Sequence, residues 1–101
     1  MSIREEVLQT LKEQTPYLQS RFGVQQLRLF GSVARGEDTT SSDIDLLYIF
    51  TPENTNYDNL FELHEYLSGL FHRDIDLIPE NWSNERFLNV VLKDAQTICS
   101  A

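Results

Sequence analysis

The sequence contains a single cysteine and no long apolar run. Cys99 is the one cysteine among 101 residues, so no internal disulfide can form, and we expect a protein of a reducing compartment such as the cytoplasm. No apolar stretch approaches the ~20 residues that span a bilayer, and the first residues lack the pattern of a signal peptide. We therefore expect neither a membrane protein nor a disulfide-stapled one.

Basic residues are also scarce. The chain has 8 lysines and arginines against 16 acidic residues, which gives a formal net charge of −8. A nucleic-acid-binding protein normally carries a basic surface, whereas the field of this chain repels phosphate. Direct nucleic-acid binding is therefore not expected, and any polyanionic ligand has to be held by a local device such as metal ions or backbone N–H groups.

The chain shows no internal repeat, low-complexity tract or linker. A hydrophobic fraction of 41% and a charged fraction of 24% are typical of globular proteins. A chain of this length can bury one core and leaves no room for a second. We predict one domain over residues 1–101.

Hydrophobic spacing predicts helices alternating with short strands. A first helix is expected from Ile3, with a capping box formed by Ser2 and Glu5, and a second short helix from Pro16 to about Gly23. Ser83 is expected to cap the last helix. The other predicted elements are strands over 24–30, 44–50 and 74–78, a polar loop over 51–57, and an edge strand near 96–100. A helix is expected after that loop, with Leu60, Leu63, Leu67 and Leu70 on one stripe. This order predicts an α/β or α+β fold with a small sheet of about four strands flanked by helices.

A glycine-serine turn directly follows the first predicted strand. Gly31 permits dihedral angles closed to other residues and lets a ligand approach the backbone. If "SVAR" begins a helical turn, its free N–H groups and the Ser32 hydroxyl can hold a phosphate without basic side chains. The alternative is an ordinary tight turn that Ser32 caps and Gly36 closes.

Two aspartates begin the second predicted strand. Asp43 and Asp45 lie two positions apart, so their carboxylates project from the same face about 7 Å apart. Such neighbours repel each other unless a cation lies between them, and Mg²⁺ or Mn²⁺ suits an all-oxygen site. The alternative is that both acids are simply solvated at a strand edge.

The third predicted strand carries another pair of acids, Asp74 and Asp76. One of them beside Asp43 and Asp45 would complete a three-carboxylate cluster able to hold two metal ions about 4 Å apart. We favour Asp76, since it lies deeper in the apolar run, whereas Asp74 could equally pair with Arg73 at the surface.

These residues together resemble the signature of the polymerase-beta-like nucleotidyltransferase superfamily. Gly31-Ser32, ten intervening residues, and then Asp43-x-Asp45 match its G-S-x10-D-x-D motif, and "IDLI" carries the third acid. The resemblance implies a mixed sheet of that fold, with Asp43, Asp45 and Asp76 as catalytic and metal-binding residues. It also implies that Gly31 and Ser32 hold the phosphates of ATP, with two Mg²⁺ ions, or Mn²⁺ in their place. Arg35 also matches the motif, and it either contacts phosphate or braces the loop by pairing with an acid.

Within that superfamily the chain resembles the minimal nucleotidyltransferases that act as antitoxins in HEPN/MNT toxin–antitoxin pairs. The resemblance implies a Mg²⁺-dependent adenylyltransferase that moves AMP from ATP to a hydroxyl, expected to be a tyrosine, of a partner HEPN toxin. The alternative is an antitoxin that masks its toxin by binding alone. Tyr57 and Trp82 border predicted loops and are candidate partner contacts.

Overall fold

A mixed four-stranded sheet lies at the centre of the computed structural model, which describes residues 2–100. Its strands are β1 (Val24–Phe30), β2 (Ile44–Phe50), β3 (Ile75–Pro79) and β4 (Gln96–Ser100), in the order β3-β2-β1-β4. β1 is antiparallel to β2 and to β4, whereas β2 and β3 are parallel. The predicted fold class is confirmed, and the predicted strands are present with the third displaced by one residue; the structure adds the strand order and directions.

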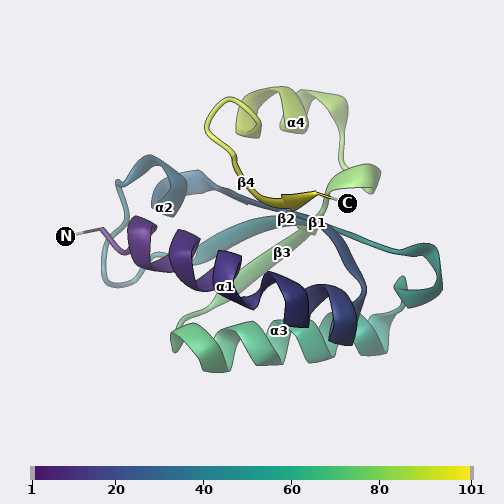
Figure 1. Ribbon diagram of the computed structural model, residues 1–101. Helices are drawn as coiled ribbons and strands as arrows, with labels where there is room; N and C mark the ends of the chain where they lie inside the picture. The colour runs from purple at the N-terminus through teal and green to yellow at the C-terminus, as the bar shows by residue number, and fades with distance from the viewer. Residues whose placement is uncertain (1, 101) are drawn as a thin grey trace.

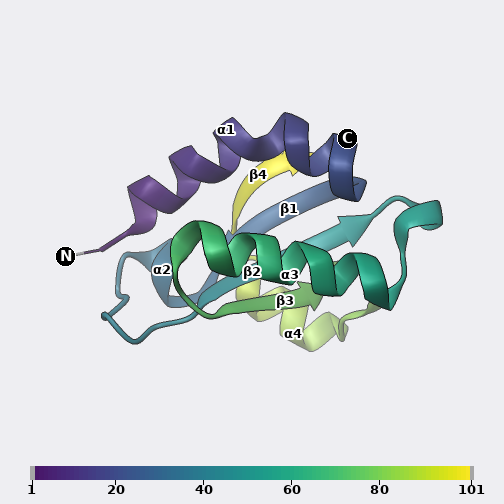
Figure 2. The ribbon, with the colours of Figure 1, turned by 90° about the horizontal axis from the view of Figure 1, so that it is seen from below.

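Helices cover the two faces of the sheet unequally. The long helices α1 (Arg4–Phe22) and α3 (Tyr57–Phe71) lie on one face, and the short helix α4 (Glu85–Val91) lies on the other (Figures 1 and 2). The single-turn helix α2 (Gly31–Arg35) joins β1 to the segment before β2, and the 3-10 helices η1 (Pro52–Asn54) and η2 (Glu80–Trp82) follow β2 and β3. Within residues 2–100, no helix combines the length and the apolar character needed to cross a membrane.

The core lies between the sheet and the two long helices. Successive strand residues alternate between the two faces, so Leu27 and Leu29 of β1 and their partners on β2 point toward α1 and α3. The fully buried side chains of this layer include Leu11, Leu18, Leu29, Ile44, Leu46, Leu63 and Leu67. Burying each such side chain contributes roughly 1.5–3 kcal/mol, so this layer fixes the strand register that positions the residues on the opposite face.

The N-terminal region forms one helix and not the two that were predicted. α1 runs without a break from Arg4 to Phe22, with Pro16 inside it. Leu11 and Leu18, one on each side of Pro16, are fully buried against the same sheet. This shared packing keeps the helix continuous although Pro16 lacks a backbone N–H. From local propensity alone, a helix break is expected at the proline.

Two predicted helix caps are also wrong. The capping box with Glu5 does not form: the Ser2 hydroxyl donates to Asp38 and accepts the Arg4 N–H at 3.0 Å, because the loop carrying Asp38 lies against the start of α1. At α4 the cap is Asn84, whose side-chain oxygen accepts from the Arg86 N–H at 2.7 Å. The Ser83 hydroxyl donates instead to the Pro79 carbonyl at 2.6 Å, which ties the end of β3 to η2.

Gly69 is the one interior position of α3 where we expect an easy gain in stability. A Cβ added there meets no atom within 4 Å, and the backbone is helical. Gly69→Ala should raise the free energy of unfolding by about 0.5–1 kcal/mol, because alanine loses less backbone entropy in a helix. Urea unfolding followed by circular dichroism measures this, and an unchanged or lower midpoint would contradict it.

Candidate functional site

Asp45 and Asp76 lie side by side on the sheet face opposite α1 and α3. They are register partners on the parallel strands β2 and β3, and register partners project from the same face. Their neighbours Ile44 and Ile75 are also partners and point into the core. Neighbouring strands lie about 4.8 Å apart, so the two carboxylates share one local environment.

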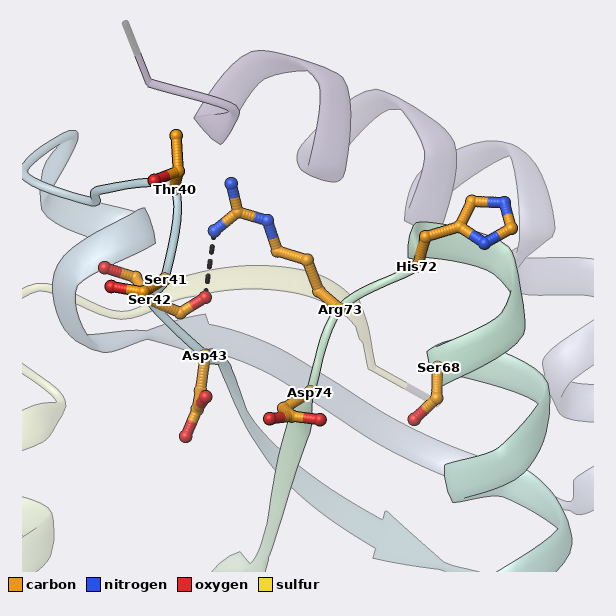
Figure 3. Close-up of a pocket in the computed structure, with 8 residues that line it drawn as sticks. All are labelled: Thr40, Ser41, Ser42, Asp43, Ser68, His72, Arg73 and Asp74. Atoms are coloured by element: carbon orange, nitrogen blue, oxygen red, sulfur yellow. Dashed lines mark hydrogen bonds between the residues drawn. The ribbon is translucent and has the colours of Figure 1, made fainter.

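Asp43 joins this face just before β2 begins. It lies two residues before Asp45, and its charge contributes to the electrostatics of Asp45. Figure 3 shows the Asp43 carboxylate beside that of Asp74, and the Ile44 N–H donates to the Asp74 carbonyl at 3.0 Å. The four aspartates therefore form two neighbouring pairs, Asp43 with Asp74 and Asp45 with Asp76.

The Asp45 carboxyl has a raised pKa. Burial, followed by the charges of Asp76 and Asp43, raises the pKa of Asp45 to about 6, and Arg35 opposes the shift only weakly. Its partner on β1 is the buried Phe30, which contacts Phe87 of α4 edge to face with ring centroids 6.0 Å apart. The site thus has an apolar wall on one side and repelling carboxylates on the other, an environment that a bound cation would relieve.

Gly31 makes room for the Asp45 carboxylate. Its φ is +78°, in the left-handed region, and a Cβ built there would lie 2.2 Å from Asp45 Oδ2. Only glycine satisfies both the backbone angle and this close approach. The turn and the aspartate, 14 positions apart in the sequence, therefore form one local unit.

Ser32 lies in α2, the helical turn predicted from the sequence. Val33 and Ala34 are buried and anchor the turn, and Gly36 ends it with a φ of +73°. The Ser32 carbonyl accepts the Glu37 N–H at 2.9 Å, so the turn is closed by its own backbone. This arrangement leaves the first N–H groups of the turn without partners inside the helix, beside Asp45.

Arg35 pairs with acids at the end of the same turn. Its Nε lies 2.8 Å from Glu37 Oε1, and its Nη1 lies 3.8 Å from Asp94 Oδ2. The hydrogen bond with Glu37 and the charge of Asp94 raise the pKa of the Arg35 guanidinium. Of the two predicted roles, the structure contains the bracing contact with acids.

Arg73 is a positioning residue whose role the sequence did not reveal. Its Nη1 donates to the carbonyls of Thr39 and Ser42, each at 2.9 Å, and so holds the loop that leads into Asp43; Figure 3 shows the bond to Ser42. The predicted alternative, a pair between Arg73 and Asp74, is therefore not formed. The position of Arg73 directly before Asp74 suggested an ion pair between the two. Arg73 instead binds backbone carbonyls, which residue type and spacing do not identify.

A hollow of about 530 Å³ lies beside the aspartates. Its lining includes Asp43, Asp74, Ser68 and His72, and it opens between the loop before β2 and the end of α3 (Figure 3). Asp45 and Asp76 are not among the residues that line it, so the hollow lies next to Asp43 and Asp74 and does not enclose the Asp45–Asp76 pair. The Asp76 side chain is exposed, so that pair lies at an open face of the sheet.

The donor set fits a hard divalent cation. Asp43, Asp45 and Asp76 offer only carboxylate oxygens, which hard divalent cations prefer, and the charges of Asp76 and Asp43 add to burial in raising the pKa of Asp45. Over residues 2–100, however, no three His, Cys, Asp or Glu side chains are close enough to form a ready-made metal centre. Mg²⁺ commonly takes one or two protein carboxylates and completes its shell with water and phosphate oxygens, which this arrangement allows.

The stability of the metal-free protein should depend on pH through Asp45. Its pKa is about 6 in the folded state and near the ordinary 3.8 in the unfolded chain, so the folded state binds the proton more tightly. The stabilisation that comes from protonated Asp45 is fully present below pH 3.8 and is lost as the pH rises through about 6. Above that pH it does not change further. Relative to wild type, Asp45→Asn should gain about 1–2 kcal/mol at pH 7, after allowance for screening of a half-buried group, and almost nothing at pH 4.

Urea unfolding of both proteins at the two pH values, without divalent cations, measures this difference. A gap between wild type and Asp45→Asn that is equal at pH 4 and pH 7 would show that Asp45 titrates normally. Addition of Mg²⁺ should narrow the gap at pH 7 if the cation binds at Asp45, since binding stabilises the ionised wild-type site alone.

The sequence matches a family model described as "Polymerase beta, Nucleotidyltransferase" over residues 12–101. The protein adenylyltransferase MntA of Thermococcus cleftensis is 33% identical over 90 residues, which cover 89% of this chain and 90% of MntA. A solved structure provisionally described as a minimal nucleotidyltransferase is similar with a TM-score of 0.77 and 33% identity, covering 95% of each chain.

The fold also recurs in a toxin–antitoxin complex. One chain of the structure of tri-AMPylated Shewanella oneidensis HEPN toxin with MNT antitoxin is similar with a TM-score of 0.65. The match covers 93% of this chain and 73% of that one, at 18% identity. At this identity the likeness concerns the fold alone.

Proposed function

The chain belongs to the polymerase beta nucleotidyltransferase family, and we propose that it transfers AMP from ATP to a tyrosine hydroxyl of a cognate HEPN toxin, which neutralises the toxin. The observation that carries the proposal is the close packing of Asp45, with Asp76 beside it, against Gly31 at the start of the α2 turn. The proposal is further supported by a relative named protein adenylyltransferase MntA and by the recurrence of the fold in a toxin–antitoxin complex.

Each site residue has a role that follows from its position. Gly31 and the free N–H groups of α2, with the Ser32 hydroxyl, would bind the β- and γ-phosphates of ATP. Asp43 and Asp45 would hold Mg²⁺, and Asp76 would complete the site. Bound there, Mg²⁺ would neutralise phosphate charge and lower the pKa of the attacking hydroxyl.

The reaction that we propose is an in-line displacement at the α-phosphorus of ATP. A new bond forms between the acceptor oxygen and the α-phosphorus, while the bond from the α-phosphorus to the bridging oxygen breaks. The electron pair leaves with pyrophosphate, and Asp76 accepts the proton of the acceptor hydroxyl before releasing it to solvent. Asp76 suits this task because its side chain is exposed at the open face.

The direct test combines the purified chain with ATP, Mg²⁺ and the HEPN-type protein encoded beside it. Mass spectrometry of the partner should reveal a gain of whole AMP units that requires all three components, and peptide mapping should place them on tyrosine. No mass gain, with both proteins folded, would contradict the proposal.

A toxin-protection experiment in cells distinguishes AMP transfer from masking of the toxin by binding alone. The double variant Asp43→Ala/Asp45→Ala should no longer protect against the toxin although it still folds and binds. Protection by this variant at the wild-type level would show that contact is sufficient and that transfer is not the mechanism.

A further inference from the structure

Three exposed aromatic side chains line one edge of the molecule. Tyr57 and Phe61 on α3 and Trp82 in η2 are 88%, 65% and 76% exposed. They line two adjoining hollows that share Tyr57 and Leu60, one against Tyr48 and Phe50 of β2 and the other along β3. We call the two hollows together the edge groove. Aromatic side chains are enriched at the buried centres of protein interfaces, and exposed ones gathered in one groove indicate a binding surface.

The edge groove leads to the candidate site. The hollow that contains Tyr57 and Phe61 is also lined by Asp76 and Leu77 of β3. Asp76 lies beside Asp45 through the parallel register of β2 and β3. A chain segment that lies in the groove therefore passes the carboxylate proposed to face the acceptor hydroxyl.

The backbone edge of β3 is partly closed. Asp74 turns its carbonyl toward β2, so by alternation Ile75 and Leu77 turn their backbone groups outward. His64 Nε2 contacts the Ile75 carbonyl at 3.0 Å, and the Ser83 hydroxyl donates to the Pro79 carbonyl at 2.6 Å. These contacts occupy two of the outward carbonyls and disfavour continuous edge-to-edge pairing with the same strand of a second copy, so we expect side-chain contacts to supply most of the binding to an occupant.

We infer that the edge groove binds an extended segment of the acceptor protein, apolar and basic in character, and leads its acceptor hydroxyl to Asp76. The inference rests on the proposed function and adds to it the surface that selects the substrate. Charge complementarity supports this occupant: the chain carries a net charge of −8, and Asp58 and Asp76 line the groove. Arginine side chains in such a segment would also bind the faces of the exposed aromatic rings.

A spectroscopic test uses Trp82, the chain's one tryptophan. Fluorotryptophan incorporated there gives a single fluorine NMR signal, and titration with the unlabelled HEPN-type partner, without ATP, should shift it in proportion to complex formation. An unchanged signal while the complex forms would overturn the inference. A shift caused by Mg²⁺-ATP alone would assign the groove to the nucleotide, and a concentration-dependent shift without partner would assign it to a second copy; both would also overturn it.

Kinetics provide the second test. Trp82→Ala and Tyr57→Ala should each raise KM for the partner protein about tenfold, with kcat and the affinity for ATP within about twofold of wild type. The matched control is Val90→Ala on α4, an exposed apolar residue outside the groove, which should leave KM unchanged. Transfer by wild type with unchanged KM in both groove variants would overturn this inference alone, whereas no transfer by wild type would overturn the proposed function.

Discussion

Replacing Asp45 with asparagine will reduce AMP transfer about 10³-fold while the protein remains folded. The substitution keeps the size and shape of the side chain but removes the charge that would hold a divalent cation over the α2 turn. Burial and two neighbouring carboxylates already raise the pKa of this group to about 6, so the folded protein tolerates the neutral form well. Loss of activity therefore comes with a gain in stability at pH 7, which separates a functional effect from unfolding.

Initial rates of AMP incorporation into the partner, measured at saturating ATP, give the size of this effect. The control is Glu53→Gln in η1, which removes an exposed carboxylate outside the four-aspartate group and should transfer AMP at the wild-type rate. Asp45→Asn with more than about a tenth of wild-type activity would show that this carboxylate does not act in transfer.

Gly31→Ala should damage both stability and activity, and Gly36→Ala should damage stability alone. The two glycines have nearly the same backbone angle, with φ of +78° and +73°. They differ in space: a Cβ at Gly31 would lie 2.2 Å from Asp45 Oδ2, whereas a Cβ at Gly36 has no atom closer than 4.0 Å. In both variants alanine is strained by the left-handed backbone, which lowers the free energy of unfolding, but only Gly31→Ala displaces the Asp45 carboxylate.

We expect Gly36→Ala to cost about 1 kcal/mol and to keep transfer within a few-fold of wild type. Gly31→Ala should cost roughly 2–4 kcal/mol and reduce transfer at least about 100-fold, because the clash adds to the backbone strain and moves a site residue. Urea unfolding and the AMP transfer assay measure both quantities. Equal behaviour of the two variants would show that the Gly31–Asp45 contact has no functional consequence.

Much of the fold could be predicted from local patterns. The strands near Val24–Phe30 and Ile44–Phe50 are short apolar runs, and the helix over Tyr57–Phe71 has its leucines on one stripe. Two of the errors arose where a distant contact overrode a local signal. Pro16 does not break α1, because buried residues on both sides of it pack on one sheet, and Ser2 binds Asp38, which is 36 positions away.

The candidate site was predicted as residue types and spacings, and their roles remain a proposal. The two-residue alternation of a strand was enough to expect Asp43 and Asp45 on one face. That alternation alone did not distinguish Asp74 from Asp76; the apolar run favoured Asp76, and the register of β2 and β3 pairs Asp45 with Asp76. The alternation also could not predict that Arg73 holds the loop before Asp43 through backbone carbonyls.

The sequence by itself determined the chemistry available to this protein: an acidic chain with a glycine-serine turn and aspartates at strand spacing, which belong to one family of nucleotidyltransferases. Only the tertiary structure decided how these groups act on one another. The raised pKa of Asp45, its fit over Gly31 and the groove that reaches Asp76 all depend on strands meeting in a particular order and register. The physical reason is that residue type and spacing are properties of a local segment, whereas burial and charge repulsion arise from segments that meet only when the chain folds.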